Sequence, residues 1–95
     1  MHKLNIGMIT CNYFMRIYDN RKPADFNWGN MVAKYRSEFT RDDFRTLAKE
    51  IRRLGYENIE IWEPTFSHFV YTEKEAEDMA QELAGMGFHS IVYCI

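Results

Sequence analysis

The sequence predicts an α/β fold in which strands and helices alternate in the order β-α-β-α-β. An apolar, strand-like segment over 4–10 is followed by a helix, turn and strand pattern that occurs twice and reaches its last strand over 90–95. Strands separated by helices pair in parallel through right-handed crossovers. We therefore expect one parallel sheet, with the strands in spatial order 1-2-3 and both helices on one side.

The pattern is an internal repeat with a period of 32 residues, the distance along the chain from Thr40 to Thr72. Each threonine precedes a helical pattern, where its hydroxyl can accept a hydrogen bond from a free backbone N–H of the first turn. Glu75 completes a capping box with Thr72, and Asp43 a weaker one with Thr40. Both helices should therefore begin directly after their threonines.

Gly55 and Gly87 mark the ends of the two helices and are separated by the same period. The left-handed conformation that often follows a helix favours glycine. The expected helices cover 41–54 and 73–86, and the strands after them cover 58–62 and 90–95. Apolar residues at helical spacing should pack these helices into the core: Phe44, Leu47, Ala48, Ile51 and Leu54 in the first, and Ala76, Met79, Ala80, Leu83 and Met86 in the second.

The connection over 11–39 lies outside the repeat and is far longer than the usual 2–6 residues of such units. A connection of this length is typically a functional lid or contains structure of its own. Asn27 is a candidate N-cap for a short helix over 28–36, and Pro23 breaks the chain before it.

Composition excludes several classes of protein. The 95 residues suffice for one domain, and the apolar share of 46% with 27% charged residues is typical of globular proteins. A net charge of −2 argues against a nucleic-acid partner. No apolar run approaches the roughly 20 residues of a membrane span, and the start lacks a secretory signal, so we expect a cytoplasmic protein.

The two cysteines are expected to be free thiols. Cys11 and Cys94 fall near the ends of the first and third strands. Neighbouring strands lie about 4.8 Å apart, and the first and third strands are therefore about twice that distance apart. A disulfide needs Cα atoms within about 7 Å, so these two cysteines are too far apart to form one.

Two α/β architectures begin this way, the doubly wound sheet and the (β/α)₈ barrel. The segment 10–14 after the first strand contains no glycine, whereas a dinucleotide-binding sheet has a glycine-rich turn there. In the second strand, Glu60 and Trp62 alternate with Ile59 and Ile61. The isoleucines suit the helix-covered side. A carboxylate and an indole on the other side suit a polar barrel interior near an active site.

Three segments resemble the xylose-isomerase-like barrel superfamily, within it the sugar-phosphate isomerase/epimerase group. They are Asn-Ile-Gly-Met-Ile-Thr at 5–10, Leu-Gly-Tyr-Glu-Asn-Ile-Glu-Ile-Trp-Glu-Pro at 54–64, and Met-Gly-Phe at 86–88. The resemblance implies a (β/α)₈ (TIM) barrel of roughly 250 residues. Residues 1–95 would then be a single partial domain that supplies strands 1–3 and ends in the third strand.

The resemblance also implies a divalent metal, Mn²⁺, Mg²⁺ or Zn²⁺, held by carboxylates and histidine at the ends of later strands. Those positions would lie beyond residue 95, as would the catalytic residues. We therefore expect no metal ligand or catalytic residue in this chain, and the chain alone should be inactive.

Candidate substrate contacts follow from the rule that barrel enzymes act at the C-terminal ends of their strands. Carboxylates, histidine and amides can bind sugar hydroxyls, and aromatic rings suit the apolar C–H face of a sugar. The candidates at these ends are Asn12, Tyr13 and Phe14 after the first strand, and Glu60, Trp62, Glu63, Phe66 and His68 in and after the second.

The leading functional hypothesis is therefore the N-terminal part of a metal-dependent sugar or sugar-phosphate isomerase/epimerase. One alternative is a non-catalytic sugar-binding or structural βα fragment that works only after association. A third is an apurinic-site endonuclease-like barrel, which the acidic balance disfavours. Strands 1 and 3 would both be sheet edges, so we expect self-association or docking with the remainder of a barrel.

Overall fold

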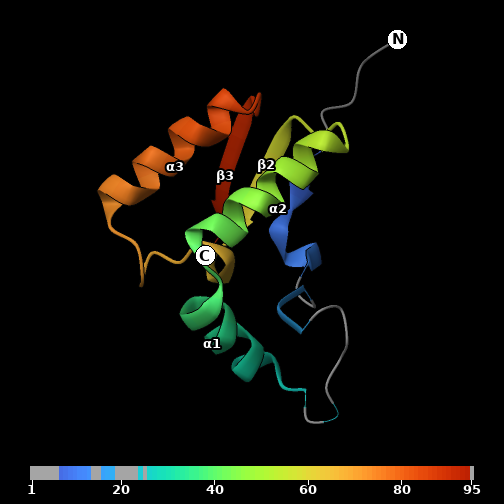
Figure 1. Ribbon diagram of the computed structural model, residues 1–95, viewed down its shortest axis with the longest axis vertical. Helices are drawn as coiled ribbons and strands as arrows, with labels where there is room; N and C mark the ends of the chain where they lie inside the picture. Colours follow the sequence, from blue (N-terminus) through green and yellow to red (C-terminus); the bar gives the residue numbers. More distant parts are fainter. Residues whose placement is uncertain (1–6, 14–15, 19–23, 25, 95) are drawn as a thin grey trace.

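The computed structural model describes residues 7–13, 16–18, 24 and 26–94. Three parallel strands form one sheet in the order β1-β2-β3, with β1 at Gly7–Ile9, β2 at Asn58–Trp62 and β3 at Ser90–Cys94. Helices α2 (Arg41–Arg53) and α3 (Glu73–Gly85) lie on one face of this sheet (Figure 1). The α/β class, the parallel pairing and the strand order are confirmed. Residues 4–6 and 95 of the expected strands lie outside the described residues.

The register of the sheet separates its two faces. Ile59 pairs with Met8 on one side and with Ile91 on the other, so these three residues share the face that carries the helices. Glu60 pairs with Ile9 and Val92 on the opposite face. Ile59 and Ile61 are buried whereas Glu60 is exposed, which confirms the predicted alternation along β2.

Both long helices begin directly after their threonines, as predicted, and each start has a capping box. Thr40 accepts a hydrogen bond from the backbone N–H of Asp43 at 3.0 Å, and the Asp43 carboxylate accepts one from the Thr40 N–H at 2.8 Å. Thr72 and Glu75 form the same reciprocal pair at the start of α3. Each capping box satisfies two N–H groups that a helix start would leave unpaired.

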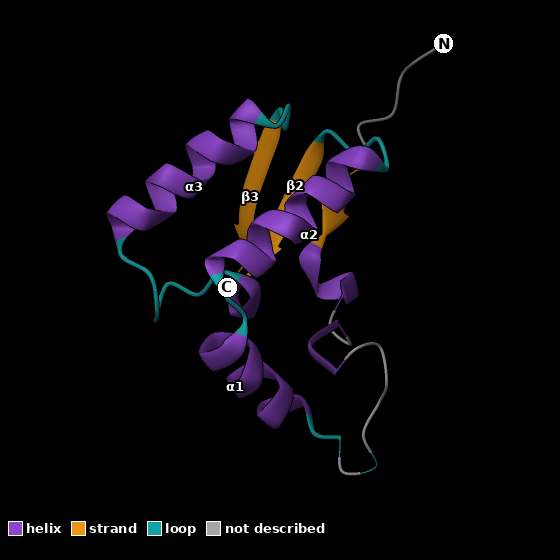
Figure 2. Cartoon of the chain, in the orientation of Figure 1, coloured by secondary structure: helices purple, strands orange, loops and turns teal. Residues whose placement is uncertain are grey.

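The long connection contains a helix, as the sequence predicts, together with short 3₁₀ helices. Helix α1 covers Trp28–Glu38, and Asn27 caps it by accepting from the Asn30 N–H at 3.1 Å. The 3₁₀ helices are η1 (Thr10–Tyr13) and η2 (Arg16–Tyr18), and η3 (Glu63–Thr65) follows β2. Helix α1 lies beyond the C-terminal ends of the strands (Figure 2). Pro23 lies outside the described residues.

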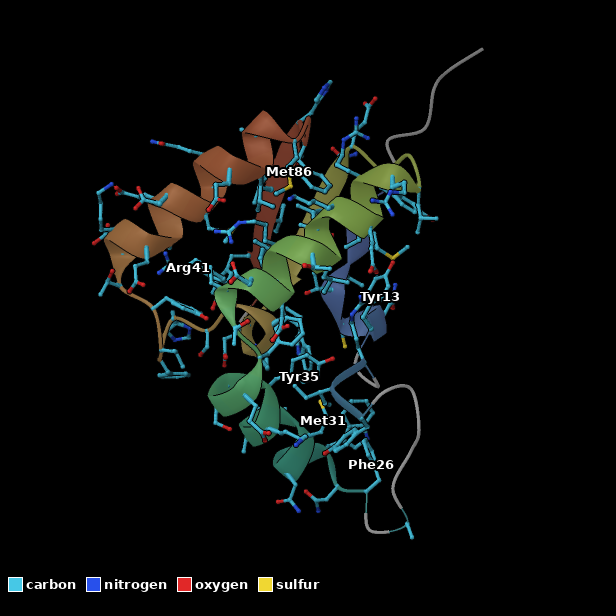
Figure 3. All side chains as sticks on the ribbon, viewed as in Figure 1. Tyr13, Phe26, Met31, Tyr35, Arg41 and Met86 are labelled. Atoms are coloured by element: carbon cyan, nitrogen blue, oxygen red, sulfur yellow. The ribbon has the colours of Figure 1, made fainter. Side chains whose placement is uncertain are left out.

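The core is formed mainly by the helix faces turned toward β2. Four residues of α2 are fully buried, namely Phe44, Leu47, Ala48 and Ile51. Met31 and Tyr35 of α1 are equally buried, and Figure 3 shows Tyr35 between α1 and the strand ends. Met79 and Leu83 of α3, Phe66 and Phe88 complete the same cluster.

Three residues expected in the core are exposed instead. Leu54 is 67% exposed because it is the C-cap of α2, one position past the last turn that packs on the sheet. Ala76 and Ala80 are exposed because they lie on the side of α3 that no described element covers. The prediction was wrong here since it assumed that every apolar helix position would meet a neighbour.

Two further expectations concern the state of the cysteines and membrane-spanning segments. Cys11 and Cys94 are both free thiols, as predicted. Burial raises the pKa of the Cys11 thiol. None of the described helices combines the length and apolar character needed to cross a membrane.

Gly55 and Gly87 provide a matched test of the two turns. Both have positive φ, 99° and 100°, which an alanine adopts at a cost of about 1–2 kcal/mol. A Cβ at Gly87 would lie 3.0 Å from the Arg52 guanidinium, whereas one at Gly55 would meet nothing within 4 Å. We expect Gly87→Ala to lower the free energy of unfolding more than Gly55→Ala, as measured by urea denaturation. Equal losses would show that backbone strain alone decides both.

Candidate functional site

Buried hydroxyls join the C-terminal ends of β1 and β2. Thr10 and Thr65 are 0% and 1% exposed, and their oxygens lie 2.9 Å apart. The Thr65 hydroxyl is 2.6 Å from the carbonyl of Trp62, and the Trp62 N–H is 2.8 Å from the Thr10 oxygen. Since Thr65 donates its one proton to that carbonyl, Thr10 must be the donor in the bond between the threonines. This closed set of bonds, the threonine bracket, fixes the start of η3 against β1.

Glu63 is buried beside the threonine bracket and bound to α1. Its side chain is 5% exposed, and Arg36 Nε lies 3.1 and 3.0 Å from its two carboxylate oxygens. The Arg36 Nη2 donates to the same carboxylate, and the guanidinium also lies over the ring of Phe69. The hydrogen bonds from Arg36 lower the pKa of Glu63, and one from Ser67 acts in the same direction. The ion pair therefore holds α1 against η3.

His68 lies in the turn that follows η3, beside Tyr93 of β3. The Tyr93 hydroxyl donates to the carbonyl of Phe66 at 3.0 Å and accepts from the His68 N–H at 3.0 Å. His68 Nδ1 lies 3.2 Å from the same oxygen. Because the hydroxyl proton is already used, Nδ1 must be the donor, which leaves Nε2 with a free lone pair in neutral histidine. The exposed ring can therefore accept a hydrogen bond from a ligand.

Glu60 and Trp62 lie on the other face of the sheet. Glu60 is exposed, and its nearest described hydrogen-bonding neighbour is the Cys94 thiol at 3.9 Å. Trp62 is half-buried and packs edge-on against Tyr35 of α1, with ring centroids 5.8 Å apart. A charged acceptor and a partly open indole thus stand together near the end of β2. This pair is the arrangement expected for one edge and one face of a sugar.

The structure brings together only some of the candidate residues. Asn12 is exposed and its amide lies 3.1 Å from the Met8 sulfur, away from the open face by the register of β1. Tyr13 accepts a hydrogen bond through its backbone carbonyl from the Tyr35 hydroxyl at 2.7 Å. Phe66 is buried in the core, where it stacks on Tyr71. Phe14 lies outside the described residues.

Several residues that shape this end of the sheet were not predicted from the sequence. Arg36 and Tyr35 come from the long connection, and their partners Glu63 and Trp62 lie 27 residues away in each case. No local spacing links residues so far apart. The buried Thr65 offers a local signal, since threonine hydroxyls often hydrogen-bond a backbone carbonyl three or four residues earlier, as Thr65 does with Trp62.

The described residues do not fit a metal centre. Among them, no three histidine, cysteine or acidic side chains lie close enough to hold an ion. Glu63 is engaged by Arg36, and Glu60 lies on the face opposite to the one that carries His68 and Tyr93.

Comparisons with protein-family models, with curated proteins and with solved structures found no match to this chain. The assignment of a function therefore rests on the residues themselves.

The Glu63–Arg36 pair predicts a specific dependence of stability on pH. A carboxyl whose pKa is lowered in the folded state stabilises the protein above its unfolded pKa of about 4.3, and this contribution is lost as the pH falls through the folded value. Glu63→Gln should lower the free energy of unfolding at pH 7 by about 1.5–3 kcal/mol. The difference from wild type should shrink below pH of about 4. Urea denaturation at several pH values measures it.

Glu60→Gln is the matched control, because it removes an exposed carboxylate from the same strand region. A loss of stability from Glu63→Gln that is independent of pH, or one matched by Glu60→Gln, would contradict the ion-pair argument.

A second prediction concerns metal binding by the chain alone. We expect Mn²⁺ and Mg²⁺ to bind no better than to a generic carboxylate surface, because the described acidic and histidine side chains are not grouped. Isothermal titration calorimetry measures this. A one-to-one site of micromolar affinity would overturn it and would direct attention to Glu63 and His68.

Proposed function

We propose that this chain supplies the first three strands and part of the substrate-binding surface of a sugar or sugar-phosphate isomerase/epimerase with a barrel fold. The observation that carries the proposal is the position of Glu60 and Trp62 on the sheet face opposite to α2 and α3. In a barrel this face lines the interior, and the ends of its strands hold the substrate.

Glu60 and Trp62 have complementary roles in this proposal. The carboxylate of Glu60 accepts hydrogen bonds from sugar hydroxyls, and bonds to an ionised acceptor are stronger than those to a neutral one. The indole of Trp62 provides an apolar wall whose orientation is fixed by Tyr35. His68 and Asn12 stay candidate contacts, and they would reach a substrate only around the end of the sheet.

Rigidity at the strand ends supports a binding role. The threonine bracket and the Glu63–Arg36 pair fix both the start of η3 and the position of α1. A sugar site needs such support because binding groups that are held in place lose little freedom when a ligand arrives. The buried polar groups at these strand ends thus act as positioning residues for the surface beside Trp62.

A βα fragment that works only after association is the second candidate. Two observations favour it: β1 and β3 each pair only with β2 among the described strands, and one side of α3 is open. Unpaired strand edges recruit further strands or chains. This candidate and the barrel proposal differ in whether a sugar binds.

Tryptophan fluorescence tests the sugar site directly. The chain has two tryptophans, so Trp28→Phe leaves Trp62 as the single reporter. We expect at least one aldose, ketose or corresponding phosphate to change the Trp62 emission saturably at millimolar concentration. Glu60→Gln should weaken that binding about fivefold, since it exchanges a charged acceptor for a neutral one.

Glu77→Gln is the matched control, because Glu77 is an exposed carboxylate on α3, away from the open sheet face. A panel of pentoses, hexoses and their phosphates that gives no saturable change would refute the sugar site. An equal effect of Glu60→Gln and Glu77→Gln would show that any binding is nonspecific.

A further inference from the structure

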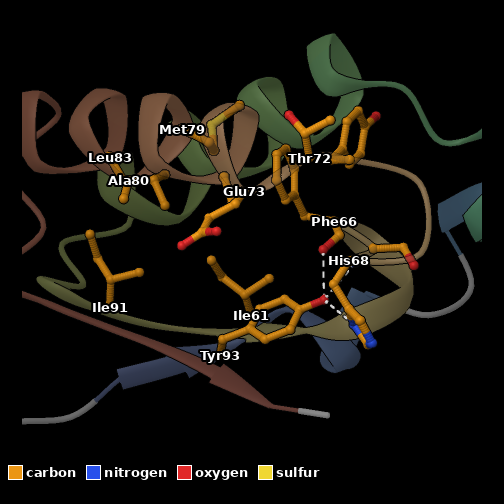
Figure 4. A pocket seen from close by; sticks show the side chains of 13 residues that line it. Ile61, Phe66, His68, Thr72, Glu73, Met79, Ala80, Leu83, Ile91 and Tyr93 are labelled. Atoms are coloured by element: carbon orange, nitrogen blue, oxygen red, sulfur yellow. Dashed lines mark hydrogen bonds between the residues drawn. The ribbon is translucent and has the colours of Figure 1, made fainter.

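An apolar groove lies between α3 and β3 on the helix-covered side of the sheet (Figure 4). It has a volume of about 460 Å³. Its floor contains Ile61 and Ile91, and its wall is the side of α3 that carries Ala76 and Ala80. Both alanines are exposed although their spacing predicts core positions. The groove is therefore a packing site that no described part of the chain fills.

The repeat shows what fills the equivalent site one unit earlier. When the unit that begins at Thr72 is aligned with the one at Thr40, Ala76 matches Phe44 and Ala80 matches Ala48. These two residues of α2 are fully buried, and α3 lies beside α2 on the same face of the sheet (Figure 1). The groove beside α3 thus has the shape of a site that accepts one more helix.

Charge distinguishes the two sites. Arg41 and Arg45 of α2 form ion pairs with Glu75 and Glu82 of α3, the second pair at 2.7 Å. The same alignment of the two units matches Glu73 with Arg41 and Glu77 with Arg45. α3 therefore presents acidic residues where α2 presents basic ones. Figure 4 shows the Glu73 carboxylate pointing into the largely apolar groove.

We propose that the groove between α3 and β3 binds an amphipathic helix of a partner polypeptide that carries basic residues opposite Glu73 and Glu77. The apolar stripe of that helix covers Ala76, Ala80 and the isoleucines of the sheet, and its cations pair with the two carboxylates. Attraction across such a helix pair sets the choice of partner as well as its orientation.

A second copy of this chain does not offer such a helix among its described elements. The basic helix α2 has already buried its apolar stripe in its own core. This proposal rests on the second candidate function, a βα fragment that works after association, because in a complete barrel the next helix of the barrel itself would fill the groove. Glu60 and Trp62 lie on the opposite face of the sheet, whereas His68 lines the groove.

A peptide derived from α3 provides the probe, because α3 is the element that fills the equivalent site beside α2. The peptide covers residues 71–87 with Glu82→Arg and Glu75→Gln. Arginine provides the cation for Glu77. Glutamine removes the repulsion from Glu73 and keeps the capping box, which tolerates glutamine at that position. The unmodified acidic sequence is the control peptide.

Fluorescence anisotropy with the full chain measures binding of both labelled peptides at low and high salt. We expect the basic peptide to bind one-to-one and about fivefold or more tighter than the acidic one at low salt, since one exposed pair contributes up to about 1 kcal/mol and the acidic peptide is also repelled. The preference should decrease at high salt because the pairs are exposed.

Three variants of the chain locate the site. Ala80→Arg should abolish binding by filling the groove, whereas Ala33→Arg, the same change at an exposed position of α1, should leave it intact. Glu77→Arg should reverse the preference, so that the acidic peptide binds more tightly. The reversal keeps the proposal testable if Ala80→Arg perturbs folding.

Other outcomes overturn the proposal. Absence of binding, equal binding of both peptides, or binding unaffected by Ala80→Arg would each show that the groove does not take a basic helix. Sedimentation of the chain alone tests which polypeptide occupies the groove. Dimers that are lost in the Ala80→Arg variant would show that a second copy of this chain occupies it.

Discussion

The burial of one face of α2 against the sheet is the contact on which the described core depends. Four side chains of α2 are 0% exposed, and they meet Ile59 and Ile61 of the central strand. Each fully buried large apolar side chain contributes about 1.5–3 kcal/mol relative to an exposed one, so this contact is a major part of the stability. The same helix then holds α3 through Arg41 and Arg45, and its Arg52 donates to the carbonyl of Met86.

Polar contacts hold the strand ends and α1 in place beside this apolar core. The threonine bracket and the Glu63–Arg36 pair secure the strand ends and bring α1 beneath them. A buried carboxylate is costly without a partner, so Glu63 and Arg36 must be present together. The long connection is in this way part of the support for the surface beside Trp62, because α1 supplies both Arg36 and Tyr35.

The two faces of the sheet have different chemistry, and each face therefore suits a different kind of ligand. The open face near the end of β2 combines a carboxylate with an indole, which suits a small polar ligand. The face beside α3 combines a largely apolar groove with the carboxylate of Glu73, which suits a helix. Alternation along the strands allows one short sheet to present both surfaces.

The sequence by itself determined the secondary structure and the order of the strands. The capping boxes at Thr40 and Thr72, the glycines at 55 and 87, and the alternation along β2 are local signals, and the structure follows them to within about two residues. Asn27 likewise identified α1. These features were readable because a cap, a turn or a face depends on residues only a few positions apart.

Only the tertiary structure decided which of these side chains remain available. It engaged Glu63 with Arg36, placed Phe66 in the core, and left Ala76 and Ala80 beside an open groove. It also separated His68 from Glu60 by placing them toward opposite faces of the sheet. Each of these outcomes depends on which distant segments pack together, and a residue type or a helical spacing does not reveal its partner. Burial and pairing across about thirty residues of chain are settled by packing, which local patterns do not specify.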